Sequence, residues 1–179
     1  AVTIFILGYV NLLIFLLIIV IVIGLFTYGA FDIRSQFFLP TLVSLSENKK
    51  DVLLTFDDGP DPIRTPLILD VLKQHNIKAV FFCIGNKLEG NADLVRRIIS
   101  DGHIIGNHTH VHSPMNGLFS SEKITQELTE AQLAMDKVAD YKMSWFRPPY
   151  GVSNPMIAQS VRKLSLKTQI HFLLNSPEI

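Results

Sequence analysis

The sequence predicts an α/β protein with a parallel sheet, preceded by one transmembrane helix. Residues 1–31 carry no charged side chain, although the chain has 16 basic and 16 acidic residues among its 179. From Asp51 onward, short apolar runs alternate with segments of helical periodicity, which implies parallel strands joined by right-handed helical crossovers. The alternation alone leaves open whether the sheet is doubly wound or part of a barrel.

The N-terminal segment is predicted to contact a lipid bilayer. From Ile4 to Phe26 the chain is nearly continuous Ile, Leu, Val and Phe, and about 20 such residues span the hydrocarbon. A cleaved signal peptide has a basic start and a shorter apolar stretch, so the pattern favours an uncleaved anchor. We therefore expect a transmembrane helix at 3–28, a juxtamembrane linker at 29–50 and a globular domain at 51–179.

Five apolar runs in the globular part are predicted as strands, because turn or helix signals bound each of them. They lie at residues 51–56, 79–84, 104–105, 143–146 and 168–174. The cluster Asp57–Pro62 (DDGPDP) after the first run is expected to be a loop.

Start and stop signals place the helices between these strands. Thr65, with Pro66 at the first helical position, is expected to cap a helix whose apolar side is Leu67, Val71 and Leu72. The next helix is predicted between an Asn91 cap and Gly102. Two more helices are expected to start near Ser121 and at Asn154.

Overall charge and the single cysteine exclude some functions. The formal net charge is +0 and there is no basic block, so the sequence has no footprint for nucleic acid. Cys83 lies in an apolar run and is expected to be a small buried hydrophobe.

Polar residues follow several predicted strands, where sites form in parallel α/β folds. Asp57 and Asp58 follow the first strand, and adjacent carboxylates can divide metal binding and proton uptake between them. By itself the Asp-Asp-Gly-Pro sequence is also good turn chemistry. Arg147 follows the fourth strand, where it is either a solvated charge at a rigid turn or a guanidinium that orients a carboxylate.

Three histidines follow the third strand, at 108, 110 and 112. Alternate imidazoles can face one point in extended backbone, or two can meet across a turn. Zinc accepts histidine nitrogen together with aspartate oxygen. Taken together, the strand ends predict metal-dependent hydrolysis.

Three strings of this sequence resemble the polysaccharide deacetylases, the NodB-homology group of carbohydrate esterases (family four). They are Thr55–Pro60 (TFDDGP), His108–His112 (HTHVH) and Arg147–Gly151 (RPPYG), in the family's order. The resemblance implies a distorted (β/α) barrel and a metal-dependent hydrolase. Such an enzyme removes N-acetyl groups from N-acetylglucosamine-containing polysaccharide, such as peptidoglycan or chitin.

The resemblance also implies roles for individual residues. Asp58, His108 and His112 become the ligands of a divalent metal, usually Zn²⁺, and Asp57 becomes the general base that deprotonates the attacking water. Arg147 orients Asp57, and the backbone N–H of Tyr150 helps to hold the oxyanion. Substrate binding falls to Pro149, Tyr150 and Gly151, while His110 lies on a variable position outside the metal shell.

The resemblance weakens toward residue 179. Asn175 and Glu178 stand where the family's fourth motif has aspartates, and a fifth motif with the general-acid histidine would lie beyond Ile179. His171 has the wrong context to replace it. The barrel is therefore expected to be truncated, as a fragment or as a shortened homologue. The alternative function is a catalytically impaired, membrane-anchored homologue that lacks the general acid and binds glycan or metal.

Two arguments about membrane orientation disagree. Arg34, Lys49 and Lys50 follow the apolar span, which favours a cytoplasmic globular domain. The family's glycan substrates favour the extracytoplasmic side. Because three basic residues are a small bias, we expect a single-pass membrane protein with its domain outside the cytoplasm.

Overall fold

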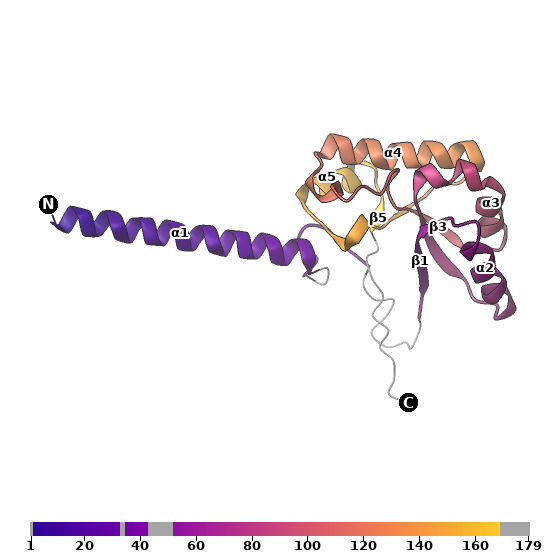
Figure 1. The fold of residues 1–179 in the computed structure, drawn as a ribbon, viewed down its shortest axis with the longest axis horizontal. Coiled ribbons are helices and arrows are strands. Elements are labelled where there is room, and N and C mark those ends of the chain that lie inside the picture. Colours follow the sequence, from indigo (N-terminus) through magenta and orange to yellow (C-terminus); the bar gives the residue numbers. More distant parts are fainter. Residues whose placement is uncertain (1, 33–34, 43–51, 169–179) are drawn as a thin grey trace, which may run out of the picture.

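The computed structural model describes residues 2–32, 35–42 and 52–168, and side chains from Tyr9 onward. A long helix, α1 (Val2–Phe31), projects from an α/β domain (Figure 1). The strands are β1 (Leu54–Gly59), β2 (Ala79–Cys83), β3 (Ile104–Asn107), β4 (Trp145–Phe146) and β5 (Lys167–Thr168). The helices of the domain are α2 (Arg64–Gln74), α3 (Ala92–Ser100), α4 (Ser121–Val138) and α5 (Pro155–Lys163). Single 3₁₀ turns lie at η2 (Gly85–Lys87), η3 (Glu89–Asn91), η4 (Asn116–Leu118) and η5 (Pro149–Gly151).

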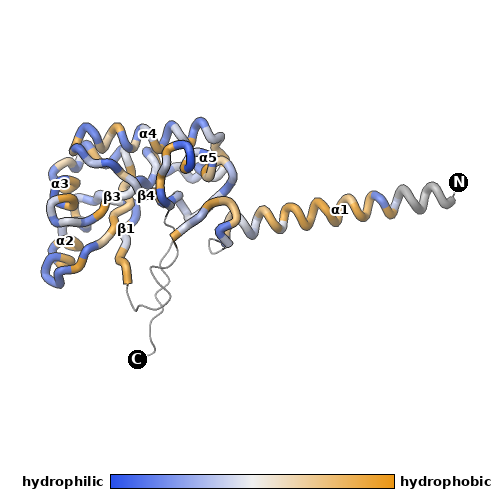
Figure 2. The backbone as a smooth tube through the Cα atoms, turned by 180° about the vertical axis from the view of Figure 1, so that it is seen from behind, coloured by the Kyte–Doolittle hydropathy of each residue, from blue (hydrophilic) through white to orange (hydrophobic). Residues whose placement is uncertain are grey.

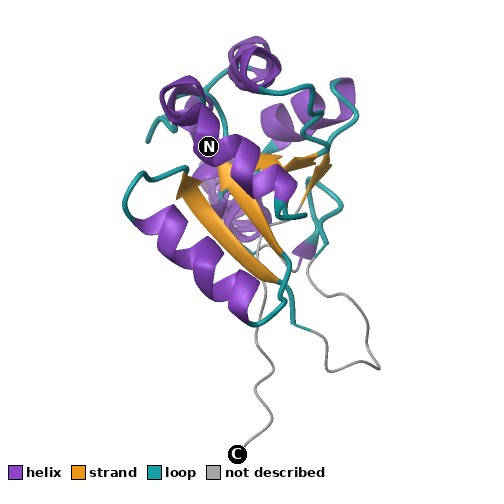
Figure 3. Cartoon of the chain, turned by 90° about the vertical axis from the view of Figure 1, so that its right-hand side faces the viewer, coloured by secondary structure: helices purple, strands orange, loops and turns teal. Residues whose placement is uncertain are grey.

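The order of the strands resolves the choice between a doubly wound sheet and a barrel. All described strands pair in parallel, in the sequential order β1-β2-β3-β4-β5. A doubly wound sheet reverses its strand order at a switch point, whereas a barrel runs in sequence. Figure 3 shows the strands side by side with helices packed around them. The fold therefore follows barrel topology, as the resemblance implied.

Both faces of the inner strand β2 are buried, as expected for a parallel sheet. Phe81 and Cys83 pack into a core with α2, α3 and α4, to which Leu69, Ile98 and Met135 contribute. Cys83 is buried, which confirms the prediction of a small buried hydrophobe, and burial raises the pKa of its thiol to about 12. A second core joins α4, β4 and α5, and its members are Leu39, Ile124, Leu128, Phe146, Ile157, Ala158 and Val161.

Helix α1 is apolar around its whole circumference, as the orange tube in Figure 2 shows. Among the described residues it is the one helix long and apolar enough to cross a bilayer, over Tyr9–Phe31. Its last turn is bonded to the domain, because Ser153 donates its N–H to the Ala30 carbonyl (3.1 Å) and its hydroxyl to the Gly29 carbonyl (3.2 Å). The helix extends past the predicted end at residue 28, and the division at 29–50 and 51–179 stays a prediction.

The first strand lies further along the chain than predicted. It runs to Gly59 and so includes Asp57 and Asp58, which were expected in a loop. The pairing with β2 shifts between Phe56 and Gly59, and Asp58 takes a left-handed conformation (φ 65°). A strand irregularity of this kind re-aims side chains, which periodicity does not reveal.

The start of α2 also differs from the prediction. Thr65 lies inside the helix, and the Asp61 carboxylate accepts from the amides of Ile63 (2.9 Å) and Arg64 (2.7 Å). Leu67 and Val71 are exposed, so the prediction of an apolar side built on them was wrong. Leu72 is buried as predicted, and Leu69 completes the buried side.

Most other boundaries agree with the sequence. Asn154 caps α5 by accepting from the Ile157 amide (2.8 Å), and Gly102 ends α3 with φ 78°. Asn91 precedes α3 but donates to the Lys87 carbonyl rather than capping the helix. The fourth strand is shorter than predicted, and residues 169–174 of the fifth lie outside the described residues.

Candidate metal and catalytic site

The candidate residues come together at the carboxyl ends of β1, β3 and β4. Asp57 and Asp58 lie in the last part of β1, and His108 follows β3 directly. Arg147 follows β4 directly. Because β1, β2, β3 and β4 pair in parallel in that order, their carboxyl ends lie at the same edge of the sheet.

The three predicted ligands, Asp58, His108 and His112, lie together at this edge, and we call this group the metal corner. The ligand atoms of Asp58, His108 and His112 all lie within 4.8 Å of one another. Asp58 Oδ1 is 3.2 Å from His112 Nε2 and 3.6 Å from His108 Nε2. One carboxylate oxygen and two imidazole nitrogens converging in this way are a donor set that suits Zn²⁺. The residues present fit a divalent cation.

The tautomer of His108 suits a ligand. Its Nδ1 lies 2.7 Å from the Arg147 carbonyl, which accepts the Nδ1 proton and leaves the Nε2 lone pair facing Asp58. The side chain is 3% exposed, and this burial is the main cause that lowers its pKa. Neutral imidazole, the form that binds metals, is thereby favoured.

The loop after β3 coils so that His108 and His112 meet, which resolves the alternatives left open by the sequence. Thr109 (φ 65°) and His112 (φ 54°) are both left-handed. The Asn107 side chain accepts from the Thr109 amide (2.9 Å), and the Thr109 hydroxyl accepts from the His112 amide (3.1 Å). His110 turns toward Gly85 and stays outside the corner, as predicted.

The Asp57 carboxylate is bonded to Arg147. A guanidinium nitrogen of Arg147 donates to Asp57 Oδ1 (2.6 Å) and to the Thr55 hydroxyl (3.0 Å). The guanidinium also lies 4.2 Å from the centre of the Phe82 ring. Burial lowers the pKa of Arg147 while Asp57 opposes the shift, and arginine remains charged in proteins. The two adjacent carboxylates thus serve different partners.

A family comparison agrees with this geometry. The family model described as "Polysaccharide deacetylase" matches residues 44–169. The chain belongs to the polysaccharide deacetylase family.

Curated relatives and solved structures of this family are similar to the chain. A peptidoglycan-N-acetylglucosamine deacetylase of Bacillus cereus is 44% identical over 104 residues, covering 58% of this chain and 38% of the relative. The crystal structure of the Bc1960 peptidoglycan N-acetylglucosamine deacetylase matches with a TM-score of 0.67 and 36% identity, covering 72% of this chain and 59% of that one. A family-four pseudoenzyme of Bacillus anthracis matches with a TM-score of 0.65 and 28% identity, over 70% of this chain and 44% of that one. The chain therefore spans only part of the length of these relatives.

In this deacetylase-family domain, the RPPYG string forms the 3₁₀ turn η5 beside the histidines. Pro149 is buried, whereas Tyr150 is 63% exposed and its ring centre lies 5.0 Å from that of His112. Tyr150 (φ 59°) and Gly151 (φ 67°) are both left-handed. Of the three predicted substrate-binding residues, Tyr150 thus adjoins His112, and Pro149 and Gly151 are its neighbours in the chain. Asn175, Glu178 and His171 lie outside the described residues.

Sequence reasoning found Arg147 as a support of Asp57 but missed other residues that support the site. Asn107, Thr55 and Glu127 contact the loop or the arginine, but no motif contains Asn107 or Glu127. Glu127 had a detectable signal, because it lies on the same face of α4 as the apolar residues Ile124, Leu128 and Ala131. A charged residue on a buried face predicts a buried partner.

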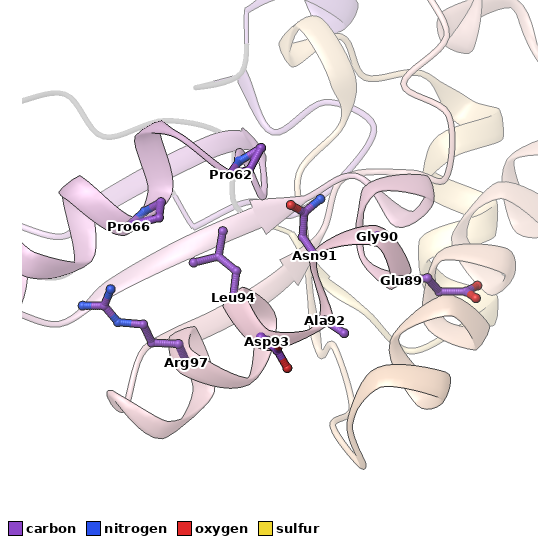
Figure 4. A pocket seen from close by; sticks show the side chains of 9 residues that line it. All are labelled: Pro62, Pro66, Glu89, Gly90, Asn91, Ala92, Asp93, Leu94 and Arg97. Carbon is purple, nitrogen blue, oxygen red and sulfur yellow. The ribbon is translucent and has the colours of Figure 1, made fainter.

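A separate cavity of about 530 Å³ opens near the same edge (Figure 4). Pro62 and Pro66 line it from the α2 side, and Asn91, Leu94 and Arg97 from the α3 side. None of the residues in the metal corner line it. The cavity is therefore distinct from the candidate metal site.

Proposed function

We propose that this domain hydrolyses N-acetyl groups from an N-acetylglucosamine-containing polysaccharide of the peptidoglycan or chitin type, with Zn²⁺ as its cofactor. One observation carries the proposal: Asp58, His108 and His112 converge, while the neighbouring Asp57 is bonded to Arg147. Relatives named peptidoglycan-N-acetylglucosamine deacetylase and chitooligosaccharide deacetylase support the substrate class.

The proposed roles follow from the contacts. Asp58, His108 and His112 would hold the cation, which when bound polarises an amide carbonyl and lowers the pKa of water. Asp57 is the proton acceptor, because its carboxylate is held in place by the guanidinium 2.6 Å away. Hydrolysis adds water across the C–N bond, so that acetate and a free amine form. Among the described residues, we assign none to protonate the leaving amine.

The exposed turn η5 is proposed to receive the acetamido group. Pro148 and Pro149 stiffen its entry, and the left-handed Tyr150 turns the backbone at the edge of the corner. The Tyr150 backbone N–H is our proposed donor to the developing oxyanion, a contribution that elsewhere amounts to a factor of about 10²–10³ in rate. The Tyr150 ring, exposed beside His112, would pack against a sugar face.

The domain is proposed to act at a membrane, on its extracytoplasmic side. Helix α1 suits a single membrane span in length and composition. The bonds from Ser153 to Gly29 and Ala30 would keep the domain next to the end of that span. Protease treatment of intact cells tests the topology: cleavage of the domain without lysis is expected, and full protection would contradict it.

Acetate release from N-acetylglucosamine oligomers and from purified peptidoglycan tests the activity. The full chain in detergent is expected to release acetate with Zn²⁺ and to stop when the metal is chelated. Asp57→Asn is expected to lower the rate by about 10²–10⁴-fold. Asp93→Asn, which changes an exposed carboxylate on α3, is the matched control. A folded, zinc-loaded chain that releases no acetate would contradict the proposed function.

A further inference from the structure

Glu127 is a buried carboxylate that the proposed chemistry does not use. It lies in the middle of α4, is 2% exposed, and is flanked by the apolar residues Ile124 and Leu128. Burial of a carboxylate is strongly unfavourable unless other groups pair with it and bond to it. Its retention on this face therefore requires specific partners.

The partners of Glu127 are in the histidine loop and on its own helix. Glu127 Oε2 accepts from the backbone amides of His110 (3.2 Å) and Val111 (3.0 Å). Glu127 Oε1 lies 3.3 Å from the ammonium of Lys123, one turn earlier in α4. One oxygen thus binds the loop, while the other is neutralised by a cation that reaches in from the surface.

The bonded amides belong to residues that lie between the two histidines of the metal corner. The opposite side of this segment is also fixed, because the carbonyls of Thr109 and His110 accept from the amides of Gly85 (2.9 Å) and Asn86 (3.0 Å). The space is tight: a Cβ on Gly85 would lie 2.7 Å from both Ala131 Cα and His110 Nδ1. The loop is therefore clamped from two sides. Backbone amides of η2 donate to its carbonyls, and the Glu127 carboxylate accepts from its amides.

The clamp matters because the loop conformation is unfavourable. Thr109 and His112 both hold left-handed backbone conformations, which persist only where the surroundings impose them. This conformation brings the imidazoles of His108 and His112 to a ring-centre distance of 4.8 Å. Without the bonds to the amides of His110 and Val111, the loop would become more flexible, and the two imidazoles would no longer be held toward one point.

We propose that Glu127 is a positioning residue for the metal site, which acts by fixing the backbone between His108 and His112. This inference rests on the metal corner of the proposed function. Glu127 touches no candidate ligand atom, so its effect is to preorganise the pair of imidazoles. Loss of groups that support metal ligands weakens metal affinity by about 10–100-fold.

Metal titration of the full chain in detergent tests the proposal directly. Zn²⁺ affinity is measured by competition with a chelating dye, and ligand geometry by the visible spectrum of bound Co²⁺. Glu127→Gln keeps the side-chain shape but loses the charge and its pairing with Lys123. We expect a metal dissociation constant about 10–100-fold higher and a changed Co²⁺ spectrum.

The control is Glu130→Gln, which changes the next acidic residue on α4, where Glu130 bonds to the exposed Gln126 side chain. Its metal affinity is expected to match the original chain. Glu127→Asp is the second variant in case Glu127→Gln does not fold. It keeps the charge but withdraws the oxygens from the loop by one methylene group, so the same weakening is expected.

The possible outcomes distinguish a positioning role of Glu127 from a purely structural one. A folded Glu127 variant that is less stable but keeps the original metal affinity and Co²⁺ spectrum would show a purely structural role and overturn the proposal. An original chain that binds no Zn²⁺ would overturn both the metal site and this inference. Zinc binding without acetate release would contradict only the deacetylase activity, and the role of Glu127 would still be measured.

Discussion

The two segments that supply the candidate metal ligands are held in different ways. The histidine loop after β3 starts from the buried residues His108 and Thr109 and is fixed by side chains, since Asn107, Thr109 and Glu127 all accept from its amides. The end of β1 is more open, and the Asp58 side chain is 62% exposed. Its backbone is fixed by a left-handed turn, and the Asp58 carbonyl accepts from the Lys87 ammonium (2.8 Å).

This difference suggests that the two segments affect different properties of the proposed site. The histidine pair is a preformed half of the proposed metal site, whereas the β1 end presents one carboxylate toward that half and turns the other to Arg147. Changes at the histidine loop should therefore act on metal affinity. Changes around Asp57 should act on turnover with the metal still bound.

Arg147→Met is expected to give the largest difference between the effect on the rate of acetate release and the effect on zinc affinity. The methionine fills space against Phe82 but removes the guanidinium that holds Asp57, and the backbone carbonyl that orients His108 remains. The rate of acetate release should fall by at least about 100-fold. Zinc affinity, measured by the same dye competition, should change by less than about 10-fold, below the range for loss of a supporting group. An unchanged rate would show that Arg147 does not position Asp57.

Thr109→Val should act on zinc affinity rather than on Asp57. The variant keeps the branched shape but loses the hydroxyl that accepts from the His112 amide. Zinc affinity is expected to fall about 10-fold, the lower end for a group that supports a ligand. Thr109→Ser retains the hydroxyl and serves as the control. Equal zinc affinity of the valine and serine variants would contradict a preformed histidine loop.

Asn154→Ala tests a cap outside both ligand segments. The change removes the acceptor for the Ile157 amide and the donor to the Gly117 carbonyl. Loss of such a cap lowers the free energy of unfolding by about 1 kcal/mol. Urea unfolding measures this loss, while zinc affinity of the folded chain should stay the same. Weaker zinc binding in this variant would mean that the site is not insulated from α5.

The smallest effect concerns His103, at the opposite end of β3 from the site. Burial, and then the charge of Lys78, lower its pKa from 6.5, and its Nδ1 accepts from the Ala79 amide (3.2 Å). Since the folded state disfavours the protonated ring, its contribution to stability is fully present above pH 6.5 and is lost as the pH falls below that value.

His103→Gln isolates this contribution, because the amide oxygen can still accept from Ala79 but does not titrate. Between pH 7.5 and 5, the original chain should lose more stability than the variant, by about 1 kcal/mol or less, comparable to one hydrogen bond. Urea unfolding of both zinc-free chains at the two pH values measures the difference. Equal losses would show that His103 is not a source of pH dependence.

Much of the fold was accessible from local patterns. The apolar spacing of Ile124, Leu128 and Met135 predicted α4, and all three residues are buried. The alternation of strands and helices predicted parallel pairing, which is confirmed. Periodicity failed at Leu67 and Val71, because the face of α2 that turns to the core depends on where neighbouring helices lie.

The candidate ligands and the pairing of Arg147 with Asp57 could be predicted, but most of the residues that support the site could not. Asp58, His108 and His112 were predicted as ligands from the resemblance of the TFDDGP and HTHVH strings to the polysaccharide deacetylases, and their ligand atoms do converge. The left-handed turn of Asp58 inside β1 and the bonds from Glu127 depend on segments distant in sequence. Such contacts leave little trace in a single sequence.

Paired zinc titrations of Asp57→Asn and Asp58→Asn test the central claim most directly, namely that adjacent carboxylates have separate roles. The two substitutions are identical in chemistry and differ by one position. We expect Asp57→Asn to bind zinc like the original chain but to release acetate about 10²–10⁴-fold more slowly. Asp58→Asn should bind zinc at least about 100-fold more weakly, beyond the effect of a supporting group. Zinc binding lost in Asp57→Asn, or retained in Asp58→Asn, would contradict the central claim.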